Sequence, residues 1–290
     1  MDNYDFSLER HLRDMSKELH LYFTDVVFAL QHALSNYKLI FPDFTDHTEL
    51  HSLNVIEFCN KLIGDQINKL NADEIYSLLV GCYFHDIGMG VSKKDFDEFS
   101  KQIDFGDYFE THERDNYPEI IRNFHNEFSG LFIRKYARLF EFPSEAHMYA
   151  VIQISRGHRK TDLNNDNEYP SALSIPNSSN TICVKYLSSL IRLADEIDVT
   201  AARNSKIIYD LNHINGEKNI IEFMKHEAVK GLDVNEDEFI MKVHTDDESV
   251  FDGLVKVAGK MQKTLDECRS VVANKTSFTI TQKRVRVERI

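Results

Sequence analysis

The chain has 290 residues, of which 42% are apolar and 28% charged, as in an ordinary globular protein. Its formal charge of −13 disfavours binding of long nucleic acid, which needs clustered Lys and Arg, but leaves small anionic substrates open because bound cations can reverse the local potential. No stretch approaches the ~18 uncharged apolar residues of a membrane span, the N-terminus lacks the basic start of a signal peptide, and the four cysteines form no CxxC pair, so we expect a cytoplasmic protein without a membrane partner.

Apolar residues recur at helical spacing through most of the first 200 residues. The pattern predicts helices over residues 6–37, 48–62 and 72–85. Gly64 is expected to end the second of these helices, and Asn71 to cap the start of the third. The N-terminal part of the chain is therefore predicted to be helical.

The middle of the chain interrupts this pattern and then resumes it. Residues 91–118 are polar and rich in aromatic side chains, which predicts an excursion with one short helix. Helical spacing returns over residues 119–140 and 143–155. The stretch 162–180 is rich in Asn, Ser, Pro and Asp and is predicted to be a loop, followed by a strongly apolar helix over residues 181–199.

The pattern changes after about residue 204. One long helix and three strands are predicted there, at residues 247–273, 206–211, 239–244 and 278–287. The chain is thus predicted to be mainly α, with an all-helical domain over residues 1–204 and a small α+β unit over residues 205–290. Dimerisation and substrate recognition are both open as roles of this unit, and the chain could form a homo-oligomer. Its basic last strand could equally be an edge protected by charge.

The dipeptide His85–Asp86 closes the apolar stretch 75–84. An imidazole and a carboxylate at the end of an apolar run both need a partner, because an unpaired buried charge is very costly. A divalent cation would satisfy both groups. Further candidate ligands lie on other predicted helices or at helix ends: His51, His125, His158 and Asp195.

Each of these candidates also has a purely structural explanation. His47, one turn before His51, could be a polar residue at a helix start. His125 could be a half-exposed histidine on an amphipathic helix, and Asp195 could pair with Arg192. The case for a metal site therefore depends on the order of all the candidates together.

In that order the candidates resemble the HD superfamily of metal-dependent phosphohydrolases, over approximately residues 40–200. The family signature, a His, a His-Asp pair and an Asp, falls on His51, His85, Asp86 and Asp195. Members with two further histidines hold two metals, which implies that His125 and His158 are ligands and that Asp86 bridges the ions. His112 is a rival for the position of His125. The segments around His158 and Asp195 are similar to exopolyphosphatase/guanosine-pentaphosphatase domains and to HD domains of prokaryotic conflict systems.

The resemblance implies a metal-dependent phosphohydrolase that cleaves a phosphate ester or anhydride of a small nucleotide, either a nucleoside triphosphate or a cyclic or signalling nucleotide. Its cofactors would be two divalent ions that activate water, from among Mn, Fe, Co, Ni, Zn and Mg. Besides Asp86, the expected catalytic residues are Arg122 and His47, the latter to orient water or contact phosphate. The alternatives are an HD nuclease acting on single-stranded nucleic acid and a nucleotide-binding signalling module without turnover.

Three cations are candidates for binding the substrate phosphate: Arg122, Arg159 and Lys160. Arg122 shares a predicted helix face with Ser129 and a proposed ligand, but could instead form a salt bridge to a nearby glutamate. Arg159 and Lys160 could simply be a solvated helix end that complements the helix dipole.

Overall fold

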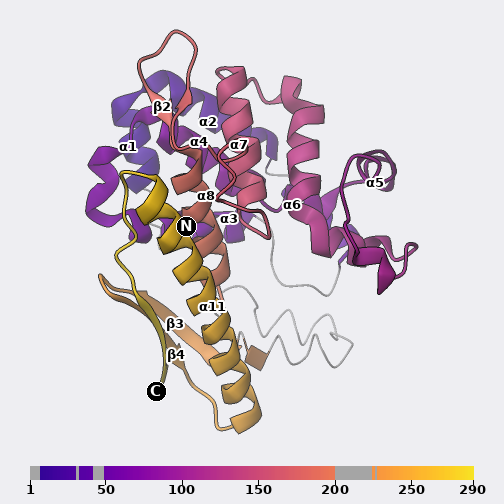
Figure 1. The fold of residues 1–290 in the computed structure, drawn as a ribbon, viewed down its shortest axis with the longest axis vertical. Coiled ribbons are helices and arrows are strands. Elements are labelled where there is room, and N and C mark those ends of the chain that lie inside the picture. The colour runs from indigo at the N-terminus through magenta and orange to yellow at the C-terminus, as the bar shows by residue number, and fades with distance from the viewer. Residues whose placement is uncertain (1–6, 31–32, 42–48, 200–223, 226) are drawn as a thin grey trace.

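The structure is a computed structural model that describes residues 7–30, 33–41, 49–199, 224–225 and 227–290. Over these residues it is mainly α-helical, with a small sheet toward the C-terminus (Figure 1), which confirms the predicted fold class. Among the described residues, we find no helix that combines the length and the apolar character needed to cross a membrane. The predicted strand at 206–211, the predicted domain boundary near residue 204 and the candidate His47 lie outside the described residues.

The N-terminal segment forms two helices, α1 (Ser7–Met15) and α2 (Lys17–Leu30), followed by the 3-10 turn η1 (Leu34–Leu39). The sequence predicted helix throughout, and the break at Ser16 has a local cause. The Ser16 hydroxyl accepts a hydrogen bond from the Leu19 amide at 3.2 Å, as a residue at a helix start does.

The next two helices are α3 (Glu49–Ile63) and α4 (Ala72–Phe84), joined by the 3-10 turn η2 (Gly64–Lys69). Gly64 has a φ of 50°, the left-handed conformation of a glycine after a helix end, and Asn71 forms a capping box with Glu74. Both predicted helix boundaries are confirmed. His85 ends α4, and the turn η3 (Ile87–Gly90) follows Asp86.

The excursion at 91–118 contains α5 (Lys93–Phe99) and a short 3-10 turn η4 (Tyr108–Glu110). It packs its aromatic side chains against α6 (Tyr117–Tyr136), as in the stacked pair Phe96 and Phe128. Beyond α6 come the turn η5 (Ala137–Leu139) and helix α7 (Glu145–Gly157).

A two-residue hairpin precedes the last helix of the helical part. Strands β1 (Leu173–Ser174) and β2 (Thr181–Ile182) pair antiparallel, and α8 (Val184–Ile197) follows. The predictions of an unbroken loop over 162–180 and of helix from residue 181 are therefore wrong at β1 and β2, since such short strands have no periodic signal. Glu74 fixes this junction, because its carboxylate accepts a hydrogen bond from the Cys183 amide at 3.1 Å.

The C-terminal unit contains β3 (Val229–Val234), β4 (Glu238–Val243), helix α11 (Glu248–Lys275) and β5 (Arg284–Arg289), with β4 in the middle of the sheet. β4 pairs antiparallel with β3 and parallel with β5. No strand was predicted at β3, and the last strand was predicted to begin at residue 278, before its actual start at Arg284. The cause is a long-range contact, since Gln66 occupies the backbone amide and carbonyl of Thr279 and so replaces strand pairing there.

The C-terminal unit shares one hydrophobic core with the helices. Met261 and Leu265 of α11 are fully buried in the same apolar cluster as Leu190 of α8. In Figure 1, α11 lies along α8, and the two helices pack directly against each other. Since α8 also packs against α3, α4 and α7, it is the central helix on which the candidate site is built.

Candidate metal centre

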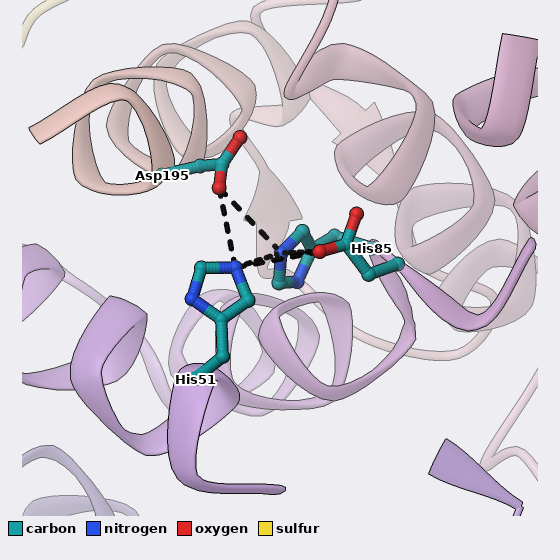
Figure 2. A group of neighbouring side chains, drawn as sticks. His51, His85 and Asp195 are labelled. Carbon is teal, nitrogen blue, oxygen red and sulfur yellow. Dashed lines mark hydrogen bonds and ion pairs between the residues drawn. The ribbon is translucent and has the colours of Figure 1, made fainter. Parts of the chain in front are cut away.

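All six predicted ligands converge between α3, α4, α6, α7 and α8. The structure brings them into two groups, His51, His85, Asp86 and Asp195 on one side, and Asp86, His125 and His158 on the other. Within each group the potential ligand atoms all lie within 4.8 Å of one another. Figure 2 shows His51, His85 and Asp195 pointing toward a common centre from three helices. The set that looked scattered in the sequence is thus one cluster in space.

The first group is centred on one oxygen of Asp86. His51 Nε2 lies 3.4 Å and His85 Nε2 lies 3.2 Å from Asp86 Oδ2. Asp195 Oδ1 completes the group at 3.2 Å from His51 Nε2 and 3.9 Å from His85 Nε2. Two imidazoles and two carboxylates therefore face one point.

The second group uses the other oxygen of the same carboxylate. His125 Nε2 lies 3.2 Å and His158 Nε2 lies 3.6 Å from Asp86 Oδ1. One oxygen of Asp86 thus faces each group, which is the arrangement that a carboxylate needs to bridge two ions.

The imidazole rings are all held by a hydrogen bond from Nδ1. His85, His125 and His158 each face the carbonyl of the residue three positions earlier, with Nδ1 to oxygen distances of 2.7, 3.0 and 2.5 Å. His51 Nδ1 lies 2.7 Å from Asp198 Oδ2. A carbonyl or carboxylate can only accept, so the proton of a neutral ring lies on Nδ1 and Nε2 carries a lone pair. Each Nε2 is thereby prepared as a ligand.

The Nε2 lone pairs of neighbouring histidines face one another, and this approach shows whether the residues fit a metal ion. The Nε2 atoms of His51 and His85 are 3.0 Å apart, and those of His125 and His158 are 2.9 Å apart. With both Nδ1 protons committed, neither member of a pair can donate to the other, and buried acceptors without a donor are costly. A divalent cation at each group removes this conflict, and imidazole nitrogen with carboxylate oxygen is a donor set that suits such ions. The residues therefore fit a pair of divalent metal ions.

The electrostatics favour the ligand protonation states. Burial lowers the pKa of His125 although Asp86 opposes it, and burial together with the neighbouring His125 and His85 lowers the pKa of His158 well below its usual value. Neutral imidazole is the form of histidine that binds metal.

Asp198 supports a predicted ligand, and the sequence reasoning missed it. Its side chain is fully buried, accepts from His51 Nδ1, and also accepts from Asn54 Nδ2 at 3.3 Å. A carboxylate behind a ligating histidine fixes the ring and raises its basicity. A second acidic residue three positions after Asp195, on the same helix end, was the available signal.

Gly88 and Ser129 join the turn after Asp86 to helix α6. The Ser129 hydroxyl donates to the His85 carbonyl at 2.7 Å and accepts from the Gly88 amide at 2.9 Å. A Cβ atom on Gly88 would lie 2.2 Å from the His125 carbonyl oxygen, so only glycine permits this approach. The sequence placed Ser129 on the face of His125, and the structure shows that it ties one ligand segment to the other.

Two of the predicted phosphate-binding cations lie beside the second group. Arg159 Nη1 donates to the Arg122 carbonyl at 3.3 Å and lies 3.4 Å from His125 Nδ1. Lys160 Nζ lies 3.5 Å from Asn123 Oδ1. Over the described ranges, neither Arg159 nor Lys160 forms an ion pair with a carboxylate. Their positive charge is therefore available to an anion.

Arg192 supports a turn at the site and does not pair with Asp195. Arg192 donates to the Gly157 carbonyl at 2.7 Å and to the Thr161 carbonyl at 2.8 Å, so it fixes the turn that carries His158 rather than pairing with Asp195.

The exposed residue Arg122 lies one turn before His125. The two glutamates considered as its partners bind other side chains, since Glu127 forms an ion pair with Arg156 and Glu119 accepts from Asn123.

The rival ligand His112 lies away from the centre. Its ring is exposed, stacks on Tyr108 at 4.1 Å, and belongs to neither ligand group found in the described part of the chain. Of the two histidines, His125 is the one that lies in the second ligand group.

A mainly helical fold with two histidine and aspartate groups sharing one carboxylate defines a protein of the HD-domain class. The sequence model of the HD-CE family matches residues 41–271, and the chain belongs to this family. The match extends beyond the helical part into α11. No curated protein and no solved structure matches the chain.

Proposed function

We propose that the protein is a metal-dependent phosphohydrolase acting on a phosphate ester or anhydride of a small nucleotide. The observation that carries this proposal is the pair of ligand groups sharing Asp86, next to Arg159 and Lys160, which form no ion pair with any carboxylate that the structure describes. Divalent ions held by these ligands would polarise a phosphoryl oxygen and lower the pKa of bound water.

The residues of the chain would bind and orient the substrate. Arg159 and Lys160 would contact phosphate oxygens, where a guanidinium offers paired donors and an ammonium a compact charge. Burial, followed by the positive charges of Arg159 and Lys260, lowers the pKa of Lys160, so an anion bound there would relieve this repulsion. Arg122 and His47 keep their predicted roles in this proposal.

The cations of the basic last strand are paired with carboxylates, which supports a small substrate over long nucleic acid. Its cations are neutralised locally, as Arg284 pairs with Glu238 at 2.8 Å and Arg289 with Glu248 at 2.9 Å. Lys283, just before the strand, pairs with Asp237 at 2.9 Å. The cations of this strand therefore do not form a free basic track for a nucleic-acid strand.

A substrate screen tests the proposal. The purified protein would be incubated with nucleoside triphosphates, cyclic dinucleotides and single-stranded DNA in the presence of Mn²⁺, with Asp86→Asn as the inactive control. We expect hydrolysis of a small nucleotide that the variant does not catalyse. Cleavage of DNA alone would favour the nuclease, and nucleotide binding without product would favour a signalling module.

A further inference from the structure

The metal centre opens on the side of α8 and α11. Asp195 is the ligand with the most exposed side chain, 20% exposed, whereas the other five ligands are buried. The next residue, Glu196, is also 20% exposed and forms an ion pair at 3.0 Å with Lys260 of α11. A cation of the C-terminal unit thus reaches the residue beside a predicted metal ligand.

Positive charge gathers on this open side. The positive charges of Lys260 and Arg159 oppose the rise that burial causes in the pKa of Glu196, and the same two charges add to the lowering of the pKa of Lys160 by burial. Lys260 Nζ lies 3.0 Å from Glu196, next to Asp195 of the first group, and Arg159 Nη1 lies 3.4 Å from His125 Nδ1 of the second group, so a cation lies beside each group. On a chain with a formal charge of −13, cations beside both ligand groups are suited to attract an anion.

Lys260 is also free to exchange its partner. Its side chain is 73% exposed, and an ion pair this exposed to water is weak. The flexible four-carbon stem can turn the ammonium from Glu196 toward a ligand without moving the helix. The metals, Arg159 and Lys160 would bind a single phosphoryl group. Lys260 could then bind a second anionic group farther along the substrate.

We propose that Lys260 forms a subsite for a second phosphoryl group, beside the first phosphoryl group that Arg159 and Lys160 would bind. The inference rests on the proposed phosphohydrolase function and deepens it, because it assigns the site to substrates that carry a diphosphate or longer chain. It also gives the C-terminal unit a role in substrate recognition through α11. Monophosphate esters would bind without using Lys260.

Binding of two inorganic probes to the Mn²⁺-loaded protein tests the subsite without depending on the nucleobase. The probes are methylenediphosphonate, a non-hydrolysable analogue of pyrophosphate, and inorganic phosphate, each titrated by calorimetry at a fixed free Mn²⁺ concentration. We expect Lys260→Gln to weaken diphosphonate binding about tenfold and to leave phosphate binding unchanged.

Lys263→Gln is the matched control. It removes the same charge from an equally exposed residue of α11, 79% exposed, that pairs with Glu267, so it should change neither affinity. Equal losses in the two variants, an unaltered affinity in Lys260→Gln, or a wild-type protein that binds both probes equally would each overturn the subsite. The proposed function fails separately, if the wild-type protein hydrolyses none of the screened small nucleotides.

Discussion

Gly88→Ala is predicted to damage the metal centre through the backbone, without touching a ligand side chain. The added Cβ would lie 2.2 Å from the His125 carbonyl oxygen and 2.6 Å from the Ser129 amide nitrogen. Both contacts are with backbone atoms of α6, so no side-chain rotation relieves them. The turn after Asp86 and helix α6 must instead separate by about 1 Å.

The size of this displacement sets the expected effect. Asp86 lies two residues before Gly88, while His125 belongs to the opposing helix, so the separation changes the distance between a shared ligand and a ligand of the second group. Metal–ligand distances tolerate changes of only about 0.2 Å. Overpacking together with loss of the Ser129 hydrogen bond should also lower the free energy of unfolding of the metal-free protein by about 2–4 kcal/mol.

Metal content by mass spectrometry and urea unfolding of the chelated protein measure these two effects. Gly259→Ala is the control, because its Cβ would have nothing within 4 Å and alanine favours a helix by up to about 1 kcal/mol. Gly81→Ala separates the two effects, since its Cβ would meet only the Ile154 side chain, at 2.6 Å, and should cost stability while keeping metal. A Gly88→Ala protein with wild-type metal content and affinity would refute the reasoning.

Three further predictions concern the ligands and their supports. His125→Ala should reduce metal content from two ions to about one, and full retention of both ions would exclude the second group as a site. Asp198→Asn should weaken metal binding about 10–100-fold, measured by calorimetry, because the His51 ring loses the carboxylate that orients it. The metal-free protein should lose stability as the pH falls below about 6.5: the pKa values of His125 and His158 are lowered, so the unfolded chain takes up protons that the folded chain does not. The slope is at most about 2.7 kcal/mol per pH unit for two histidines, and a His125→Gln, His158→Gln double variant with an unchanged slope in urea titrations at several pH values would contradict it.

Local sequence signals predicted most of the helices. Asn71, the predicted cap of α4, acts within three residues of itself, and Ser144 and Asp247, which were not predicted as caps, do the same for α7 and α11. Strands were harder to predict because their backbone groups depend on distant partners. The segment before β5 is the clearest case, since Gln66 binds the backbone of Thr279 across 213 residues.

The sequence by itself predicted the six side chains that the structure brings together. A His-Asp pair at the end of an apolar helix, with further ligands on other helices, requires a common partner because buried polar groups must be satisfied. Only the tertiary structure decided how the set is arranged: one oxygen of Asp86 faces each group, Asp198 supports His51, and Lys260 of α11 reaches the open side. The physical reason is separation along the chain, because these contacts join residues on different helices and no local pattern encodes them.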